Sequence, residues 1–337
     1  MKSFAIRGKE DAAVVEGPVP EPGDGQVRVR VRYVGICGSD LHYYYEGANG
    51  DFVVREPLVP GHELSGVIDL DPTGQWPVGT PVTVHPATFG PDVPGMEHQR
   101  HLRPGGSYLG SASTWPHTQG AMAEKLLVGR DMVRVLPAGL DLKRAALAEP
   151  LAVALHACTV AGDLTGRAVA VSGAGPIGLL VAIAARARGA SRVAVADVLA
   201  GPLARAAELG FDEVHNAIEN PLPVGEFDVA FECSAVGASI SACISALKPG
   251  GILTQVGMLP ARALPLQLGS LVSKELQWRG CFRFDDEIDE AVRLLAETDS
   301  ADAVISHVIS ADEADRAFSV ARDSDASGKV LVDVWGE

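Results

Sequence analysis

Apolar and polar residues alternate in the first 150 residues of this 337-residue chain. Residues 26–36 read QVRVRVRYVGI, with an apolar side chain at nearly every second position, as in a strand with one buried face. Residues 64–70 (LSGVIDL) and 80–86 (TPVTVHP) repeat the pattern, and glycine and proline clusters separate the three segments. The pattern predicts a β-rich first part with many short strands.

Beyond about residue 150, continuous apolar runs alternate with helical patterns. Strands are predicted at 168–173 (AVAVSG), 191–197 (SRVAVAD), 227–234 (FDVAFECS) and 251–258 (GILTQVGM). Helices are predicted at 179–189 (LLVAIAARARG), 203–210 (LARAAELG) and 241–250 (SACISALKPG). This alternation indicates a parallel sheet covered on both faces. The tail from about residue 285 contains a predicted helix at 287–297 and a strand at 329–334, which the pattern alone assigns to neither part.

Charge and cysteine content narrow the classes of function. The formal net charge of −15 repels nucleic-acid phosphates and anionic lipid, so we expect neither nucleic acid nor a membrane as a partner. One local arginine could still bind a small anion. The N-terminus lacks the apolar stretch of a signal peptide, and no run reaches the length of a membrane span. The expected location is the cytoplasm, which the odd number and unpaired spacing of the five cysteines also favour: Cys37, Cys158, Cys233, Cys243 and Cys281.

A glycine-rich turn between a predicted strand and a predicted helix indicates a dinucleotide site. Its six residues are Gly173, Ala174, Gly175, Pro176, Ile177 and Gly178. In such a G-x-G-x-x-G turn the glycines permit a tight turn, close approach of a pyrophosphate and close packing of helix on strand. Asp197 ends the next strand nineteen positions after Gly178, where a ribose-binding carboxylate is expected. Val256, in the last predicted strand of this region, is assigned to the same site. The alternative is a structural turn beside a surface aspartate.

Asp197 also bears on the choice of cofactor. A carboxylate accepts a hydrogen bond from a ribose 2′-hydroxyl but repels a 2′-phosphate. The five residues that follow it, VLAGP, contain no arginine to receive that phosphate. The sequence therefore predicts NAD rather than NADP.

Metal-ligating residue types occur at Cys37, at His62 and Glu63, and at Glu149. A catalytic zinc takes about three ligands from thiolate, imidazole and carboxylate groups and keeps one position open. Each residue also has a simpler interpretation: Cys37 as a small buried apolar residue, His62 as a hydrogen-bonded core histidine, and either glutamate as a surface carboxylate. Spacing alone leaves both interpretations open.

Several motifs in a fixed order carry a family resemblance. GICGSDLH (residues 35–42), GHE (61–63), EPLAVALHA (149–157) and GAGPIG (173–178) resemble the zinc-containing medium-chain alcohol and polyol dehydrogenases. The resemblance runs over nearly the whole chain. HYYYEG (42–47), EPLAVALHA and GCFRF (280–284) look closest to the L-idonate 5-dehydrogenases, with sorbitol and xylitol dehydrogenases next.

The resemblance implies an α/β fold in two domains. Residues 1–150 and 286–337 would form a GroES-like, β-rich catalytic domain, and residues 151–285 a Rossmann domain with a doubly wound parallel sheet that binds NAD. The relatives are dimers or tetramers, so the resemblance also implies a homo-oligomer.

Site roles follow from the same resemblance. Cys37, His62 and Glu63 match the ligands of one catalytic zinc ion per subunit, and Glu149 matches the acidic residue that contacts the zinc-bound water or replaces it. A second group matches residues that serve the reaction: Asp40 as the carboxylate that holds the ligand histidine, and Ser39 and His42 as the proton relay to solvent. Ser39 also suits a turn hydroxyl, and Asp40 suits a helix cap.

Two residues bear on the substrate. Tyr43 and Arg283 match positions that contact substrate in polyol enzymes. A guanidinium can pair with a carboxylate through two hydrogen bonds, which favours a sugar acid and the oxidation of L-idonate to 5-ketogluconate. Arg283 could instead be a surface or cofactor-contacting arginine. The alternatives are a neutral polyol dehydrogenase for sorbitol, xylitol or a butanediol, a zinc-free enone or quinone reductase, and a non-catalytic nucleotide-binding protein on the same fold.

The chain departs from many relatives in one lobe. Where they carry four closely spaced cysteines for a structural zinc, residues 85–119 contain no cysteine, which excludes a Cys₄ site. Glu97, His98 and His101 lie close together in the sequence, so another metal site is an alternative, but we interpret them as solvated loop residues. His85 and His117 are interpreted in the same way.

Overall fold

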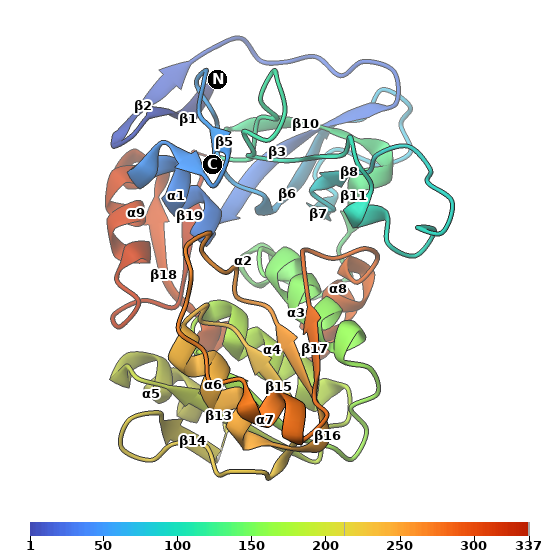
Figure 1. The fold of residues 1–337 in the computed structure, drawn as a ribbon. Helices are drawn as coiled ribbons and strands as arrows, with labels where there is room; N and C mark the ends of the chain where they lie inside the picture. Colours follow the sequence, from blue (N-terminus) through green and yellow to red (C-terminus); the bar gives the residue numbers. More distant parts are fainter. Residues whose placement is uncertain (212, 336–337) are drawn as a thin grey trace.

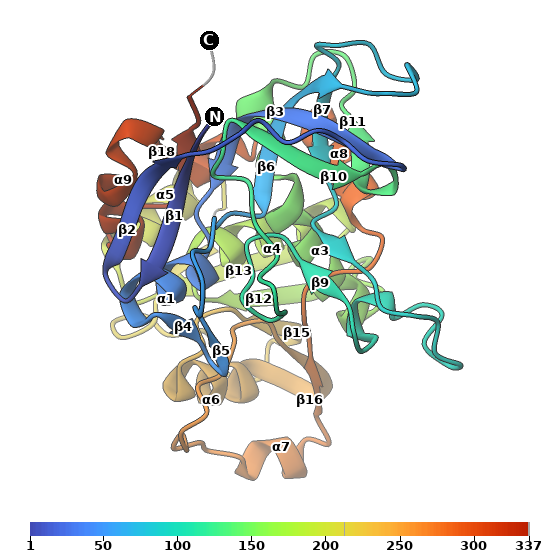
Figure 2. The same cartoon turned by 90° about the horizontal axis from the view of Figure 1, so that it is seen from above.

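The computed structural model describes residues 1–211 and 213–335. Two large sheets form the two halves of the molecule, with α2 (Leu142–Ala145), α3 (Ala148–Ala161) and α8 (Ile288–Glu297) near the junction between them (Figure 1). Figure 2 shows the same molecule from above, with the first sheet in front of the other half.

The first sheet is mostly antiparallel and centres on β3 (Gln26–Gly35). Its path runs β11-β7-β6-β3-β19-β18, and β10 also pairs with β3. The other strands are β6 (Glu63–Leu70), β7 (Pro81–Val84), β10 (Lys125–Gly129), β11 (Val133–Val135), β18 (Ile305–Ser310) and β19 (Lys329–Asp333). The predicted alternation of 26–36 is confirmed, since Val27, Val29 and Val31 are buried. Short two-stranded pairs surround the sheet: β1 (Lys2–Gly8) with β2 (Asp11–Glu16), β4 (Ala48–Asn49) with β5 (Phe52–Val53), and β8 (Ala87–Thr88) with β9 (Ser107–Tyr108).

The second sheet is parallel throughout, in the order β14-β13-β12-β15-β16-β17. Its strands are β12 (Ala168–Ser172), β13 (Arg192–Asp197), β14 (Glu213–Asn216), β15 (Phe227–Glu232), β16 (Leu247–Gln255) and β17 (Gln277–Gly280). The chain order reverses between β12 and β15, which places a switch point at the carboxyl ends of these two strands.

Helices cover both faces of this parallel sheet, as predicted. Val169 and Val171 of β12 pack into one core with α3, α4 (Pro176–Ala187) and α8. Ala170, between them, faces a second core with α6 (Gly237–Ala246). The remaining helices are α1 (Gly38–Glu46), α5 (Ala200–Glu208), α7 (Gly269–Ser273) and α9 (Ala314–Arg322).

One predicted helix is too long. The predicted segment 241–250 contains the end of α6 at Ala246, and Leu247 already begins β16. Lys248 precedes Pro249, and a residue before proline is disfavoured in the helical conformation.

The tail contributes to both halves. β19 pairs antiparallel with β3 and parallel with β18, so these two strands extend the first sheet. α8 packs instead into the core that contains α3 and α4. The domain boundaries at residues 150 and 286 stay a prediction.

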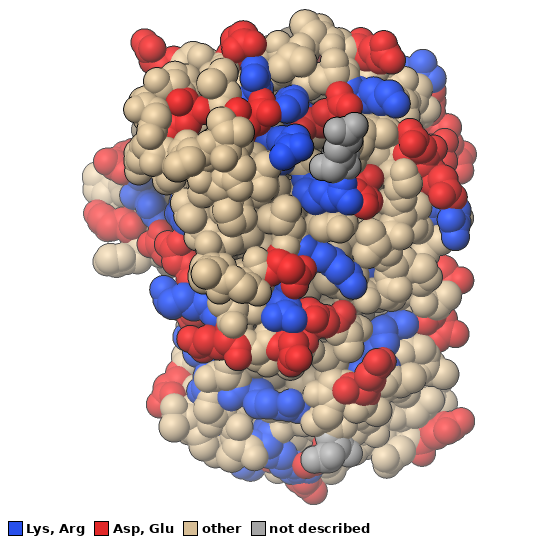
Figure 3. Space-filling view, turned by 180° about the vertical axis from the view of Figure 1, so that it is seen from behind, with Lys and Arg blue, Asp and Glu red and all other residues tan. Residues whose placement is uncertain are grey.

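Surface charge is mixed on the face drawn in Figure 3, where acidic and basic side chains are interspersed. Within the described residues, none of the helices combines the length and the apolar composition that crossing a bilayer requires.

We expect Phe318→Ala to destabilise the first half of the protein. Phe318 of α9 is fully buried, and its ring centroid lies 5.4 Å from that of Phe4 and 4.9 Å from that of Tyr44. Removing such a ring costs about 3–5 kcal/mol of unfolding free energy. Denaturant unfolding should show this loss, whereas Phe52→Ala, at a ring that is 44% exposed, should change stability little. Equal effects of the two substitutions would contradict this packing.

Candidate active site

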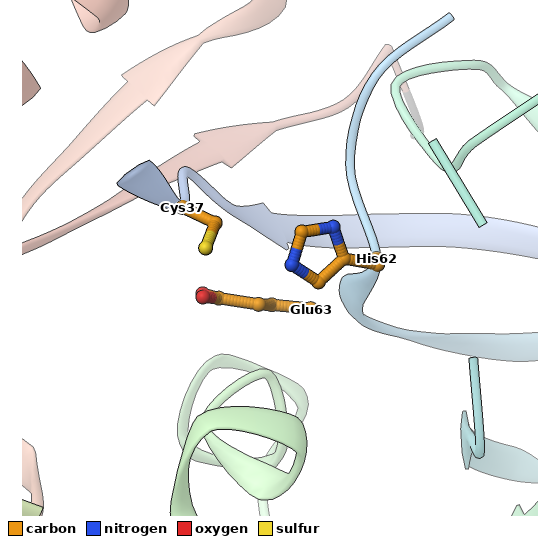
Figure 4. Close-up of side chains that lie close together, drawn as sticks. All are labelled: Cys37, His62 and Glu63. Atoms are coloured by element: carbon orange, nitrogen blue, oxygen red, sulfur yellow. The ribbon is translucent and has the colours of Figure 1, made fainter. Parts of the chain in front are cut away.

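Three metal-type donors converge where two neighbouring central strands of the first sheet, β3 and β6, end and begin. Cys37 is the N-cap residue of α1, just after β3, and Glu63 begins β6 directly after His62. Their donor atoms all lie within 4.8 Å of one another, and Figure 4 shows the three side chains pointing toward one region. This is the one group of three such residues found in the described part of the chain. The structure thus brings together all three predicted ligands.

The close approach of β3 and β6 depends on a glycine. Gly35 pairs with Glu63 in the register of the two strands. A Cβ atom at Gly35 would lie 2.0 Å from Oε2 of Glu63, so the glutamate side chain would have to leave its present position. Position 35 therefore leaves room for the glutamate side chain that enters the site.

A buried lysine pairs with Glu63. Lys329 of β19 donates from Nζ to Oε1 of Glu63 (2.6 Å) and to the carbonyl of Ile36 (3.1 Å). Burial alone would lower the pKa of Lys329, but the negative charges of Glu63 and Cys37 outweigh it and raise this pKa above its usual value. The other oxygen of Glu63, Oε2, is buried without a hydrogen-bond partner in the described structure. An unpartnered carboxylate oxygen beside a cysteine and a histidine fits a zinc ligand set.

His62 lies in a strongly anionic environment. Burial would lower its pKa, but the hydrogen bond and charge of Cys37, together with the charges of Asp40 and Glu149, raise the pKa of His62 to about 10. The negative charge that stabilises the protonated imidazole would equally stabilise a metal cation bound in place of the proton.

Asp40 organises the backbone around the ligands. Its oxygens accept hydrogen bonds from the backbone N–H of Cys37 (2.9 Å) and of Gly61 (3.1 Å). The side chain is fully buried and closes a capping box at the start of α1. It therefore holds the segments on either side of the site, and its charge acts on His62 through space.

A second row of side chains runs from Glu149 outward. Glu149, in the first turn of α3, accepts a hydrogen bond from the hydroxyl of Tyr108 at 2.5 Å. The centroid of the Tyr108 ring lies 5.4 Å from that of the His62 ring, and the guanidinium of Arg283 stacks on the Tyr108 ring, 4.1 Å from its centroid. Tyr108 thus contacts both Arg283 and Glu149, the acidic residue predicted at the metal site.

The remaining predicted residues lie on α1 in different environments. Ser39 is half-buried, and His42 is exposed with Nδ1 3.1 Å from Oε1 of Glu46. Tyr43 is 1% exposed and belongs to the core of the first sheet. Its hydroxyl accepts a hydrogen bond from the backbone of Ala112, so the structure uses this side chain for packing; its predicted contact with substrate stays a prediction.

The glycine turn has the form that a dinucleotide needs. Gly173 has φ +96°, a conformation that favours glycine, and a Cβ at Gly178 would lie 1.7 Å from the Gly173 carbonyl oxygen. Gly175 caps α4 and faces open space, since a Cβ there would meet nothing within 4 Å. Pro176 occupies the first turn of α4, and Ile177 packs on the core. The helix N-terminus and this open backbone could hold an anionic pyrophosphate, and this role stays a prediction.

Asp197 is joined to this turn. It accepts hydrogen bonds from the backbone N–H of Ala174 (2.6 Å), Val198 (2.7 Å) and Leu199 (3.0 Å). An ionised carboxylate offers about four lone-pair sites, so three amides leave capacity for one more donor.

Val256 lies at the carboxyl end of β16 in the wall of a cavity of about 810 Å³. His156 of α3, His101 of the lobe and Phe282 after β17 line the same cavity. The carboxyl edge of the parallel sheet, where ligands bind in doubly wound folds, is therefore open at this point.

The interpretation of the lobe histidines as solvated is wrong for three of them. His85 and His117 are 3% and 6% exposed, and the His101 side chain is 4% exposed. Tertiary contacts bury them: Nε2 of His85 bonds the Asp285 carbonyl at 2.9 Å, and Nε2 of His117 accepts the N–H of Arg55 at 2.9 Å.

Sequence reasoning missed two residues of the site, Lys329 and Tyr108. Lys329 begins the predicted strand 329–334, and a lysine at a strand end normally indicates solvent. The pairing of β19 with β3 in the sheet brings Lys329 to Glu63, and the sequence does not indicate this pairing. Tyr108 lies in a two-residue strand without a motif, and no sequence signal distinguishes it.

Comparison with known proteins agrees with this architecture. The sequence model of the alcohol dehydrogenase GroES-like domain matches residues 23–138, and that of the zinc-binding dehydrogenases matches residues 176–297. L-idonate 5-dehydrogenase (NAD(P)(+)) of Escherichia coli (strain K12) is 36% identical over 301 residues, which cover 88% of this chain and 87% of that protein. Sorbitol dehydrogenase of Bos taurus is 32% identical over 355 residues, covering 95% and 92%. The crystal structure of L-idonate 5-dehydrogenase from Escherichia coli superposes with a TM-score of 0.93 at 33% identity, covering 98% of this chain and 97% of that one.

A GroES-like half joined to a Rossmann sheet, with three zinc-type donors between them, defines a zinc-type dehydrogenase, and the predicted fold class is confirmed. The chain belongs to the zinc-containing medium-chain alcohol and polyol dehydrogenases. The two relatives compared above are named for a sugar acid, L-idonate, and a polyol, sorbitol.

We expect Lys329→Met to destabilise the metal-free protein. The substitution leaves the buried carboxylate of Glu63 without its cation, which costs about 3–5 kcal/mol of unfolding free energy for a buried pair. Denaturant unfolding in the presence of a chelator measures the loss. Lys248→Met is the matched control, because the Lys248–Asp228 pair is largely exposed and its loss should cost at most about 1 kcal/mol. A loss for Lys329→Met as small as the control's would contradict the structural role of the buried pair.

Proposed function

We propose that this protein oxidises a secondary hydroxyl of a sugar acid, converting L-idonate to 5-ketogluconate, with NAD and one zinc ion per subunit. The observation that carries the proposal is the row Glu149–Tyr108–Arg283, which joins a guanidinium to the metal-type site. A site that combines a hydride-transfer cofactor, a metal and a fixed cation suits a hydroxylated carboxylate.

Cys37, His62 and Glu63 would hold the zinc ion, and the free Oε2 of Glu63 is the oxygen available to it. When bound, zinc supplies Lewis acidity at the substrate oxygen, and NAD supplies the acceptor for a hydride. Lys329 keeps the other oxygen of Glu63 in place, and Glu149, fixed by Tyr108, would contact a water molecule at the site.

The chain's own residues would move the hydroxyl proton. Ser39 lies at the start of α1 beside Cys37, and His42 lies three residues further along the same helix, so both side chains share one face. In the oxidation, Ser39 Oγ accepts the substrate's hydroxyl proton while passing its own to His42, which releases it to solvent. The contact of Nδ1 with Glu46 orients the ring for this transfer. The hydroxyl thus becomes a carbonyl, with one hydride leaving to NAD and one proton to water.

Asp197 favours NAD over NADP in this proposal. Its remaining lone-pair capacity suits a ribose hydroxyl, whereas its charge opposes a 2′-phosphate. The five residues directly after Asp197 offer no arginine to reverse this preference.

A neutral polyol is the second candidate substrate. Sorbitol dehydrogenase of Bos taurus is nearly as similar as the L-idonate enzyme, at 32% against 36% identity. The zinc chemistry would be unchanged, and only the partner of Arg283 would differ. A homo-oligomer of two or four subunits stays a prediction from the family resemblance, and a cytoplasmic location stays a prediction from the cysteine content.

We expect zinc-loaded protein to form NADH with L-idonate faster than with D-gluconate, sorbitol or xylitol, and to lose turnover on treatment with a chelator. NADP in place of NAD should support a much lower rate. Initial rates of absorbance change measure all three effects. A preference for the neutral polyols would refute the sugar-acid assignment, and turnover that is indifferent to the chelator would refute the zinc mechanism.

Replacing Arg283 by methionine should weaken use of the sugar acid selectively. Loss of a charge-assisted pair with the carboxylate lowers kcat/KM for L-idonate by about 10- to 100-fold, while a neutral polyol is affected little. Arg316→Met is the matched control, because Arg316 is an exposed arginine of α9 that pairs with Glu313. The same loss with both substrates would show that Arg283 does not bind the carboxylate.

A further inference from the structure

Arg283 lies in a turn that needs support from its neighbours. The turn spans residues 282–287, between β17 and α8. Arg283 has φ +52°, in the left-handed region that residues with long side chains rarely adopt. Such a conformation persists only where surrounding contacts hold it.

The cysteine-free lobe supplies these contacts through Asp285. The carboxylate of Asp285 accepts the backbone N–H of Arg100 at 2.9 Å and Nε of Arg100 at 2.6 Å. The Asp285 carbonyl accepts a hydrogen bond from Nε2 of His85 at 2.9 Å. Asp285 is only 6% exposed, so the lobe and the turn meet in a largely dry contact.

The same contact extends to both sides of Asp285. Arg100 also pairs with Asp286, and its guanidinium stacks on the ring of Phe89 at 4.5 Å. Phe284 is buried with its ring 4.6 Å from that of His85. Phe284 and Asp285, which follow Arg283 in the turn, are therefore held by the lobe, and the Arg283 side chain lies over the ring of Tyr108.

We propose that Arg100 and Asp285 are positioning residues for Arg283, and that through them the lobe sets the preference of the enzyme for a carboxylate substrate. The assignment of the carboxylate to Arg283 rests on the function proposed above. The lobe acts through hydrogen bonds and an ion pair to the turn, without touching the substrate. Breaking the pair lets the turn relax toward an ordinary backbone conformation and moves the guanidinium out of place.

The test compares Arg100→Met and Asp285→Asn with Arg103→Met in the full-length, zinc-loaded enzyme. Arg103 is the matched control, since it lies in the same lobe and pairs with Asp92 and the Met96 carbonyl, not with the turn. Both test variants should raise KM for L-idonate, lowering kcat/KM about 10-fold or more, with kinetics on sorbitol close to those of the parent enzyme. The control should change neither.

Two further measurements separate positioning from general damage. Hydrogen–deuterium exchange should rise in residues 282–287 for both test variants and not for the control. In the double variant Arg100→Met/Arg283→Met, kcat/KM for L-idonate should equal that of Arg283→Met alone, because the two residues act through one contact.

The outcomes distinguish this inference from the proposed function. If Arg283→Met is selective for the sugar acid but Arg100→Met and Asp285→Asn are not, the positioning role is refuted and the function stands. If Arg283→Met affects both substrates alike, the sugar-acid function is refuted and specificity control by the lobe falls with it. Unchanged exchange in the turn, or losses on both substrates that merely follow a drop in stability, would also refute positioning.

Discussion

The pairing of two buried charges, Glu63 and Lys329, holds the site together. Neither group would be stable alone away from water, so each requires the other. The pair joins β6 to β19, strands that are separated by most of the chain, and both lie against the end of β3. Lys329 holds Oε1 of Glu63, and this contact fixes the orientation of the carboxylate and of its other oxygen, Oε2. Gly35, which has no side chain, leaves the space that Oε2 occupies.

The rest of the site is arranged around this pair in two layers. Asp40 fixes the backbone beside Cys37 and His62, so the position of the three donors is set by the chain itself. Outside them, Tyr108 connects Glu149 to the region of Arg283 by a hydrogen bond and a stacked guanidinium. The inner layer consists of the donors Cys37, His62 and Glu63, which suit a metal cation. The outer layer contains a cationic side chain, the guanidinium of Arg283. The groups of the inner layer repel a negatively charged substrate, so a substrate carboxylate would have its partner in the guanidinium of the outer layer.

Local patterns in the sequence predicted the elements and the glycine turn, whereas the donor set was predicted from the ordered motifs of the family resemblance. The alternation around β3, the glycine turn at Gly173 and the ordered Cys37 and His62 motifs each lie within a few residues. Lys329 and the buried histidine His85 could not be predicted, since their environments come from segments far away in the chain. For Tyr43 the motif predicts a contact with substrate, which stays a prediction. The structure shows a packing role that the motif does not indicate, since the Tyr43 hydroxyl accepts a hydrogen bond from the backbone of Ala112.

The lobe without cysteines is held to the turn before α8 by side-chain contacts. Its contacts are made by arginine, aspartate and histidine side chains, and they form as the chain folds. Residues 85–119 contain no cysteine, so oxidants that attack thiolates find none in the lobe, and the contacts that hold it to the turn form without a metal ion.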